Sequence, residues 1–94
     1  MPSMFIKHGV ADYAKWKSAF DEHEAMRREH GATGHSLHRD ADDPNVIIAV
    51  LRVSDLNRAK EFAASDELRS AMEQAGVQGP PEIWFADDVE DKRY

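Results

Sequence analysis

The sequence predicts an α+β fold in which a four-stranded antiparallel sheet carries two helices on one face. Two observations lead to this prediction. Four short segments show the alternating or continuous apolar pattern of strands, and apolar residues recur with helical spacing in the two regions between them. The resulting order is βαββαβ. Right-handed crossovers then place the first and third strands in the middle of the sheet.

The size and composition of the chain limit the classes of protein to which it can belong. It has 94 residues, no cysteine and a formal net charge of −6. We expect one domain over residues 1–88 and a charged tail over residues 89–94. The lack of cysteine excludes disulfides and thiolate nucleophiles and is typical of a cytoplasmic protein. The acidic balance argues against a nucleic-acid partner, and no apolar run approaches the roughly 20 residues of a membrane span.

The chain opens with a predicted strand followed by a predicted helix. Met4–Val10 alternates as a strand and places His8 on the same face as its apolar neighbours. Asp12 is the expected N-cap of a helix over Tyr13–His30, where apolar and aromatic residues form one broad stripe. Gly31 is the expected C-terminal stop of this helix.

The second and third strands form a predicted hairpin. Ala32–Asp40 is polar, which is typical of an edge strand, and Asp42–Asn45 has the residue types of a tight turn. The third strand, Asn45–Val53, is the most apolar stretch of the chain and presents apolar side chains to both faces of the sheet. The helices can cover only one of these faces. The sequence therefore predicts a homodimer in which sheet packs against sheet.

The second half of the fold is a helical region and a last strand. Ser54 or Asp55 caps the helical region, a break is expected near Ser65, and Gly76 closes it. Two prolines then stop further helix, and Glu82–Ala86 is the expected fourth strand. Prolines at the start of a strand are typical of a sheet edge.

Three stretches of the chain together resemble a known family. They are VADYAKWKSAFD at Val10–Asp21, DDPN at Asp42–Asn45, and SDELRSAMEQAGV at Ser65–Val77 with PEIWF after it. The pattern is similar to the dimeric α+β barrel superfamily, in the antibiotic-biosynthesis-monooxygenase-like group. The resemblance covers about Met4–Asp88. It implies a ferredoxin-like fold, a homodimer, and ligands bound between the helices and the concave face of the sheet.

The same resemblance bears on the type of reaction. The superfamily includes cofactor-free monooxygenases, polyketide cyclases and haem-degrading enzymes. The haem-degrading branch has its iron-ligating histidine where this chain has Met72, and the plant cyclase branch has a catalytic histidine where this chain has Leu68. Neither histidine is present, which argues against haem degradation and against that cyclisation chemistry, and we expect no cofactor. Haem binding through His23 or His8 is a further possibility.

Histidines are the candidates for proton transfer, because their ordinary pKa lies near neutral pH. His23 lies in the apolar stripe of the first helix and is the expected base, with His8 and Arg52 assisting. The alternatives are that His23 is a hydrogen-bonded histidine at the edge of the core and that Arg52 forms an ion pair at the end of its strand. His35 and His38 are three apart on a strand and therefore face opposite ways, which argues against a shared metal ion.

Large apolar side chains are the candidates for binding an aromatic or polyketide-like molecule. Aromatic residues at such spacings can equally be core. The substrate-binding candidates are Trp16, Phe20, Arg52, Phe62, Met72 and Trp84. A cofactor-free monooxygenase or cyclase predicts a cavity of about 300 Å³ or more that touches His23. A non-catalytic small-molecule-binding or stress-associated dimer predicts tight packing there.

Overall fold

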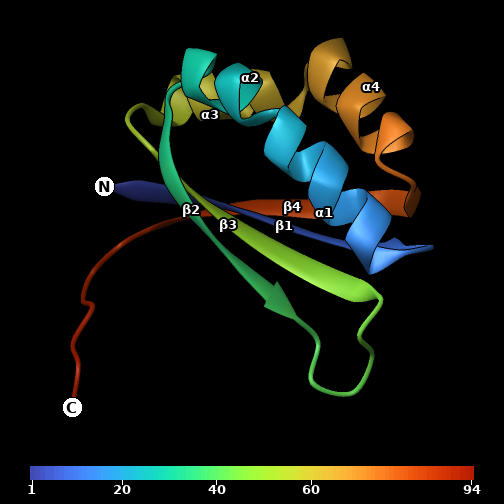
Figure 1. Cartoon of the computed structure of the whole chain (residues 1–94). Coiled ribbons are helices and arrows are strands. Elements are labelled where there is room, and N and C mark those ends of the chain that lie inside the picture. The colour runs from blue at the N-terminus through green and yellow to red at the C-terminus, as the bar shows by residue number, and fades with distance from the viewer.

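A computed structural model describes the whole chain, residues 1–94, and has the predicted architecture (Figure 1). The elements in chain order are β1 (Pro2–Val10), α1 (Tyr13–Glu22), α2 (Glu24–Glu29), β2 (Ala32–Arg39), β3 (Val46–Val53), α3 (Leu56–Ala63), α4 (Asp66–Gln74) and β4 (Val77–Asp87). The strands form one antiparallel sheet in the order β2-β3-β1-β4. All helices lie on one face of it. None of these helices is long and apolar enough to cross a membrane.

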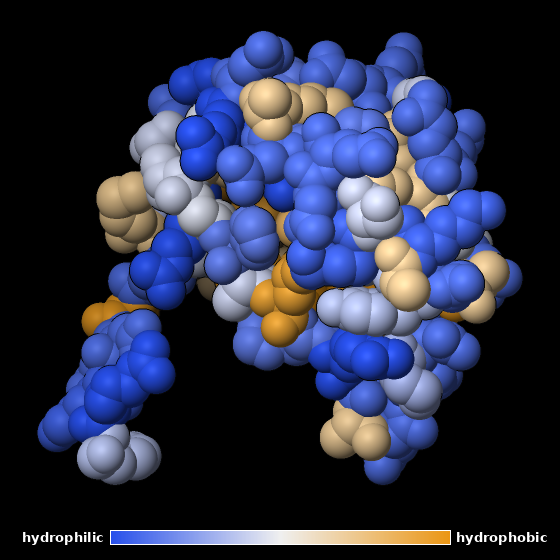
Figure 2. Space-filling model, viewed as in Figure 1, coloured by the Kyte–Doolittle hydropathy of each residue, from blue (hydrophilic) through white to orange (hydrophobic).

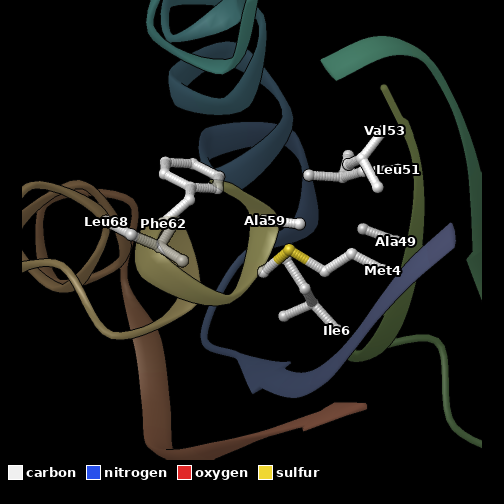
Figure 3. Close-up of a cluster of buried hydrophobic side chains, with 8 residues drawn as sticks. All are labelled: Met4, Ile6, Ala49, Leu51, Val53, Ala59, Phe62 and Leu68. Atoms are coloured by element: carbon white, nitrogen blue, oxygen red, sulfur yellow. The ribbon is translucent and has the colours of Figure 1, made fainter. Parts of the chain in front are cut away.

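The core lies between this sheet and the helices. Alternate residues of the two central strands point into it, as the strand period requires. The main cluster consists of Met4, Ile6, Ala49, Leu51 and Val53 from the sheet and Ala59, Phe62 and Leu68 from α3 and α4 (Figure 3). Burying each of the larger side chains stabilises the fold by about 1.5–3 kcal/mol. The helices are therefore held to the sheet by side chains that the alternation of β1 and β3 selects.

Side-chain caps begin the helices at the predicted positions. Asp12, Asp55 and Ser65 each accept a hydrogen bond from the backbone N–H three residues later. Of the two alternatives for the second helical region, Asp55 is thus the cap that precedes the helix. Ser65 separates α3 from α4, which confirms the predicted break. Gly31 ends α2 with a positive φ of 94°, a conformation that glycine adopts without strain.

The predicted single helix over Tyr13–His30 is wrong in one respect, because it is divided at His23. The carbonyl oxygen of Phe20 accepts the N–H of His23 at 3.2 Å and Nη1 of Arg27 at 2.6 Å. A side chain has therefore entered the hydrogen-bond ladder of the helix, which is a recognised cause of a break. This exchange brings the Arg27 guanidinium inside the fold.

The last strand is longer than predicted, since β4 covers Val77–Asp87 rather than Glu82–Ala86. Its prolines, Pro80 and Pro81, lie within the edge strand where the register with β1 shifts, and neither pairs with a β1 residue, so their missing N–H groups remove no bond from the ladder. The register with β1 shifts between Lys7 and Gly9, and His8 has no partner on β4. Bulges of this kind change the direction of nearby side chains. The irregularity lies directly beside His8.

The opposite face of the sheet has no helix over it (Figure 1). Val46, Ile48 and Val50 of β3 alternate onto this face, and Phe5 stacks on Trp84 with 5.4 Å between ring centroids. Trp84 is 43% exposed. The outer surface of the helices, by contrast, is mainly hydrophilic (Figure 2). The C-terminal tail leaves the fold on the uncovered side of the sheet.

Candidate functional site

A small apolar cavity lies between the helices and the sheet, with a volume of about 50 Å³. Fourteen residues line it, and 11 of them are hydrophobic. The three remaining residues are His8 from β1, Arg27 from α2, and His23 between α1 and α2. Ionisable side chains inside an apolar cavity are the usual starting point for a functional site.

His8 is buried beside the irregularity in β4. It is 7% exposed, its Nδ1 has no hydrogen-bond partner, and its ring meets Trp16 edge to face with 5.6 Å between centroids. Burial lowers the pKa of His8 and outweighs the opposing effect of the nearby backbone of His8 and Gly9. The imidazole is therefore neutral at pH 7. A neutral ring with an unpaired nitrogen can accept a proton from a bound molecule.

Arg27 is a site residue that the sequence analysis did not name. It is 6% exposed, its guanidinium carbon lies 3.6 Å from the centroid of the Phe20 ring, and its Nη2 has no partner. Burial lowers the pKa of Arg27, and the negative charges of Glu24 and Asp21 oppose this. The signal was present in the sequence. Arg27 follows His23 by four residues, which places both on one helical face.

Most of the predicted site residues meet at this cavity. Those that line it are His8, His23, Trp16, Phe20, Phe62 and Met72. His23 is only half-buried, since it lies at the break between α1 and α2. It therefore stands at the rim of the cavity, while His8 and Arg27 are inside. The roles of these residues remain predictions.

Arg52 and Trp84 do not line the cavity, and their prediction as ligand-binding residues of this site is corrected. Both lie on the uncovered face of the sheet, because Arg52 shares a face with Val50 and Trp84 pairs with Phe5. Nη2 of Arg52 is 3.9 Å from Oδ2 of Asp91, and both side chains are exposed. This arrangement is the ion pair at the end of the strand that the sequence left open.

The remaining histidines lie outside the cavity. His35 meets the ring of Phe20 edge to face at 5.0 Å on the helix side, whereas His38 alternates onto the other face of β2. The two therefore point apart, as expected. His30 stacks on a ring of α3, and its Nε2 is 3.2 Å from Oε1 of Glu67. No three histidine or carboxylate side chains gather closely enough to hold a metal ion.

The cavity is smaller than the enzyme hypothesis predicts. Its 50 Å³ holds a few water molecules at most, and this agrees with the alternative of tight packing. A second hollow of about 340 Å³ lies outside it, between α4 and the proline segment of β4. Met72 lines both and is the only residue that they share. The cavity and the hollow thus share one lining residue, a flexible and half-buried methionine.

Comparison with known proteins identifies the fold. Neither family models nor sequences of curated proteins match the chain. A candidate antibiotic biosynthesis monooxygenase from Bordetella bronchiseptica has a similar structure, with a TM-score of 0.80 and 15% identity over 95% of this chain and 97% of that one. SnoaB from Streptomyces nogalater, a cofactor-independent oxygenase, is similar with a TM-score of 0.74 and 16% identity, over 96% of this chain and 94% of that one. Rv0793 from Mycobacterium tuberculosis is similar with a TM-score of 0.63 and 13% identity, over 99% of this chain and 100% of that one.

Proposed function

We propose that this chain, which has the ferredoxin-like α+β fold of the antibiotic biosynthesis monooxygenase-like proteins, is a cofactor-independent monooxygenase for a small aromatic or polyketide-like molecule. The observation that carries the proposal is His8, a buried neutral histidine with an unpaired Nδ1 in an apolar cavity. The shared fold with a cofactor-independent oxygenase supports the reaction class by analogy.

The reaction needs a base and dioxygen. His8 Nδ1 removes a proton from an activated CH₂ group of the substrate, and the resulting carbanion reduces and captures O₂ as a peroxide anion. The imidazolium returns its proton to that anion. The hydroperoxide then loses water and leaves a carbonyl group, so one CH₂ and one O₂ become one C=O and one H₂O. The apolar walls disfavour charge in the ground state and keep the imidazole unprotonated before the substrate enters.

Substrate entry requires the cavity to enlarge, and we assign this step to Met72. An unbranched thioether side chain changes rotamer at low cost. Its movement would join the 50 Å³ cavity around His8 to the 340 Å³ hollow beside β4. The combined space is in the range of ligand-binding pockets, about 300–1,000 Å³. Phe62, Trp16 and Phe20 would then line the bound molecule.

Two copies of the chain are proposed to associate through the uncovered sheet face. Phe5 of the central strand β1 stacks on Trp84 of the edge strand β4, and Val50 and Ile48 of β3 lie on the other side of β1. Contiguous apolar faces of this kind are rare on soluble monomers. A second copy of the same face would cover it with matching residues, as in most two-fold dimers.

A second candidate function is supported by the small volume of the cavity. A non-catalytic dimer that binds a small molecule, or none, would also pack Met72, Phe62 and Trp16 tightly at this place. In that case His8 and Arg27 would hold ordered water. Turnover separates the two candidates, whereas binding alone does not.

The test is oxygen consumption by the purified dimer with a panel of anthrones and poly-β-ketones in the presence of a metal chelator. The monooxygenase proposal expects one quinone carbonyl formed for each O₂ consumed, measured by absorbance and an oxygen electrode. Lys15→Gln, on the exposed surface of α1, is the control and should keep the full rate. A rate no higher than that of buffer for every compound would contradict the proposal. Binding without turnover would support the second candidate.

A further inference from the structure

Arg27 carries a positive charge into the cavity without an ion-pair partner. It is 6% exposed, and only one of its guanidinium contacts is a hydrogen bond to protein, from Nη1 to the Phe20 carbonyl at 2.6 Å. Nη2 is buried and unpaired. Arg27 therefore has a buried donor left over, and its side chain lines both the apolar cavity that His8 also lines and a polar hollow of about 200 Å³ between α2 and β2.

The nearby acidic groups are engaged elsewhere. Asp21 pairs with Lys17 at 2.6 Å, and Glu24 pairs with Arg28 at 3.1 Å. Both carboxylates raise the pKa of Arg27 through their negative charge, but each forms its ion pair with another residue and neither forms one with Arg27. Burying a charged group without a partner is energetically unfavourable. A helix C-cap alone would not need this charge, because a neutral donor can also bond to a carbonyl. The free donor points to an anion that comes from outside the chain.

We propose that the cavity recognises an acidic aromatic compound, and that Arg27 binds its carboxylate, phenolate or enolate oxygen. The 11 hydrophobic residues of the wall suit an aromatic body, and Nη2 of Arg27 supplies a charged donor for the anionic oxygen. Arginine pairs well with such oxygens because its planar fork presents several N–H groups. In this arrangement Arg27 holds one end of the molecule and thereby positions the rest of it beside His8. The inference rests on the proposed function only for the enlargement of the cavity.

The experiment compares two probes of the same shape that differ in charge, 2-naphthoate and 2-naphthamide. Isothermal titration calorimetry on the purified protein at pH 7.5 gives both dissociation constants. A hydrogen bond to a charged group contributes about 1.5–3 kcal/mol, so naphthoate should bind about tenfold or more tightly than naphthamide. The ratio should fall close to one in Arg27→Met. In the matched control Arg28→Met, which removes an exposed arginine one residue away, the ratio should stay as in the wild type.

The outcomes separate this inference from the proposed function. Equal affinity of the wild type for both probes, binding of neither, or an unchanged ratio in Arg27→Met would overturn the anion site. The wild-type ratio does not depend on whether the variant folds. Turnover of a neutral anthrone with no preference for the acid would leave the monooxygenase proposal standing and reject this one. Tighter binding of the acid without turnover of any compound would support the anion site and contradict the monooxygenase proposal.

Discussion

Replacing His8 by glutamine tests the proposed base directly. Glutamine is similar in length and can form hydrogen bonds, but it cannot take up a proton at neutral pH. Removing a general base typically lowers the rate by 10²–10⁴. Burial lowers the pKa of His8, and a weaker base gains less from proton transfer, so we expect the lower part of this range. The predicted loss in kcat is about 100-fold.

The pH profile adds a signature that a structural role for His8 would not produce. Because burial lowers the pKa of His8 below 6.5, kcat/KM should rise with pH on the acid side of 6.5 and be level at pH 7 and above. The base is then already neutral at physiological pH. This dependence should disappear in His8→Gln, while Lys15→Gln, on the exposed surface of α1, should keep both rate and profile.

The assay is the initial rate of quinone formation from pH 5 to 8, with the unfolding temperature measured in the same buffers. A His8→Gln variant that folds and works within about twofold of the wild type would refute the role of His8. A 100-fold loss in His23→Gln instead would show that the residue at the rim is the base, as the sequence alone indicated. No loss in either variant would refute a histidine base altogether.

Three further predictions concern entry, assembly and stability. Met72→Ala should lower KM severalfold, because the two hollows that Met72 lines would be joined without a side-chain movement; an unchanged KM would place the entrance elsewhere. Trp84→Lys should convert the dimer into a 10.6 kDa monomer in analytical ultracentrifugation at micromolar concentration. The control Lys15→Glu, on the helix surface, should remain a dimer. A monomeric wild type would contradict the proposed dimer. Burial lowers the pKa of His8, so below pH 6.5 the histidine is protonated more readily in the unfolded chain than in the folded protein. The free energy of unfolding should therefore decrease as the pH is lowered, by up to about 1.4 kcal/mol per pH unit. In urea unfolding, the stability of His8→Leu should depend less on pH than that of the wild type over this range. An equal pH dependence in both proteins would contradict the lowered pKa of His8.

Much of the fold could be predicted from short-range patterns. The alternation in Met4–Val10 and the apolar run of Asn45–Val53 were sufficient to locate the central strands and the residues that face the helices. Asp12 and Ser65 were readable as caps because the chemistry of a cap involves residues only three apart. Such features depend on neighbours in the sequence, so the sequence carries them directly.

The candidate site was predictable only in part. His8 and His23 could be placed on inward faces by their spacing, but the wrong assignment of Arg52 and Trp84 to the cavity came from giving chemical character more weight than strand parity. The alternation that put Val50 on the far face already put Arg52 there.

Other features depend on contacts between distant segments. The irregularity of β4 beside His8 exists only once β1 and β4 pair across most of the chain length. The burial of Arg27 requires its guanidinium to reach back to the Phe20 carbonyl and break the helix, and no propensity rule predicts that exchange. The volumes of the two hollows, and the contact of Met72 with both, depend on how side chains from several elements fill one space. The sequence by itself thus determined the strands, the caps and the inward faces, because these follow from local periodicity. Only the tertiary structure decided which polar atoms stayed without a partner inside, because that depends on every neighbour in the packed fold.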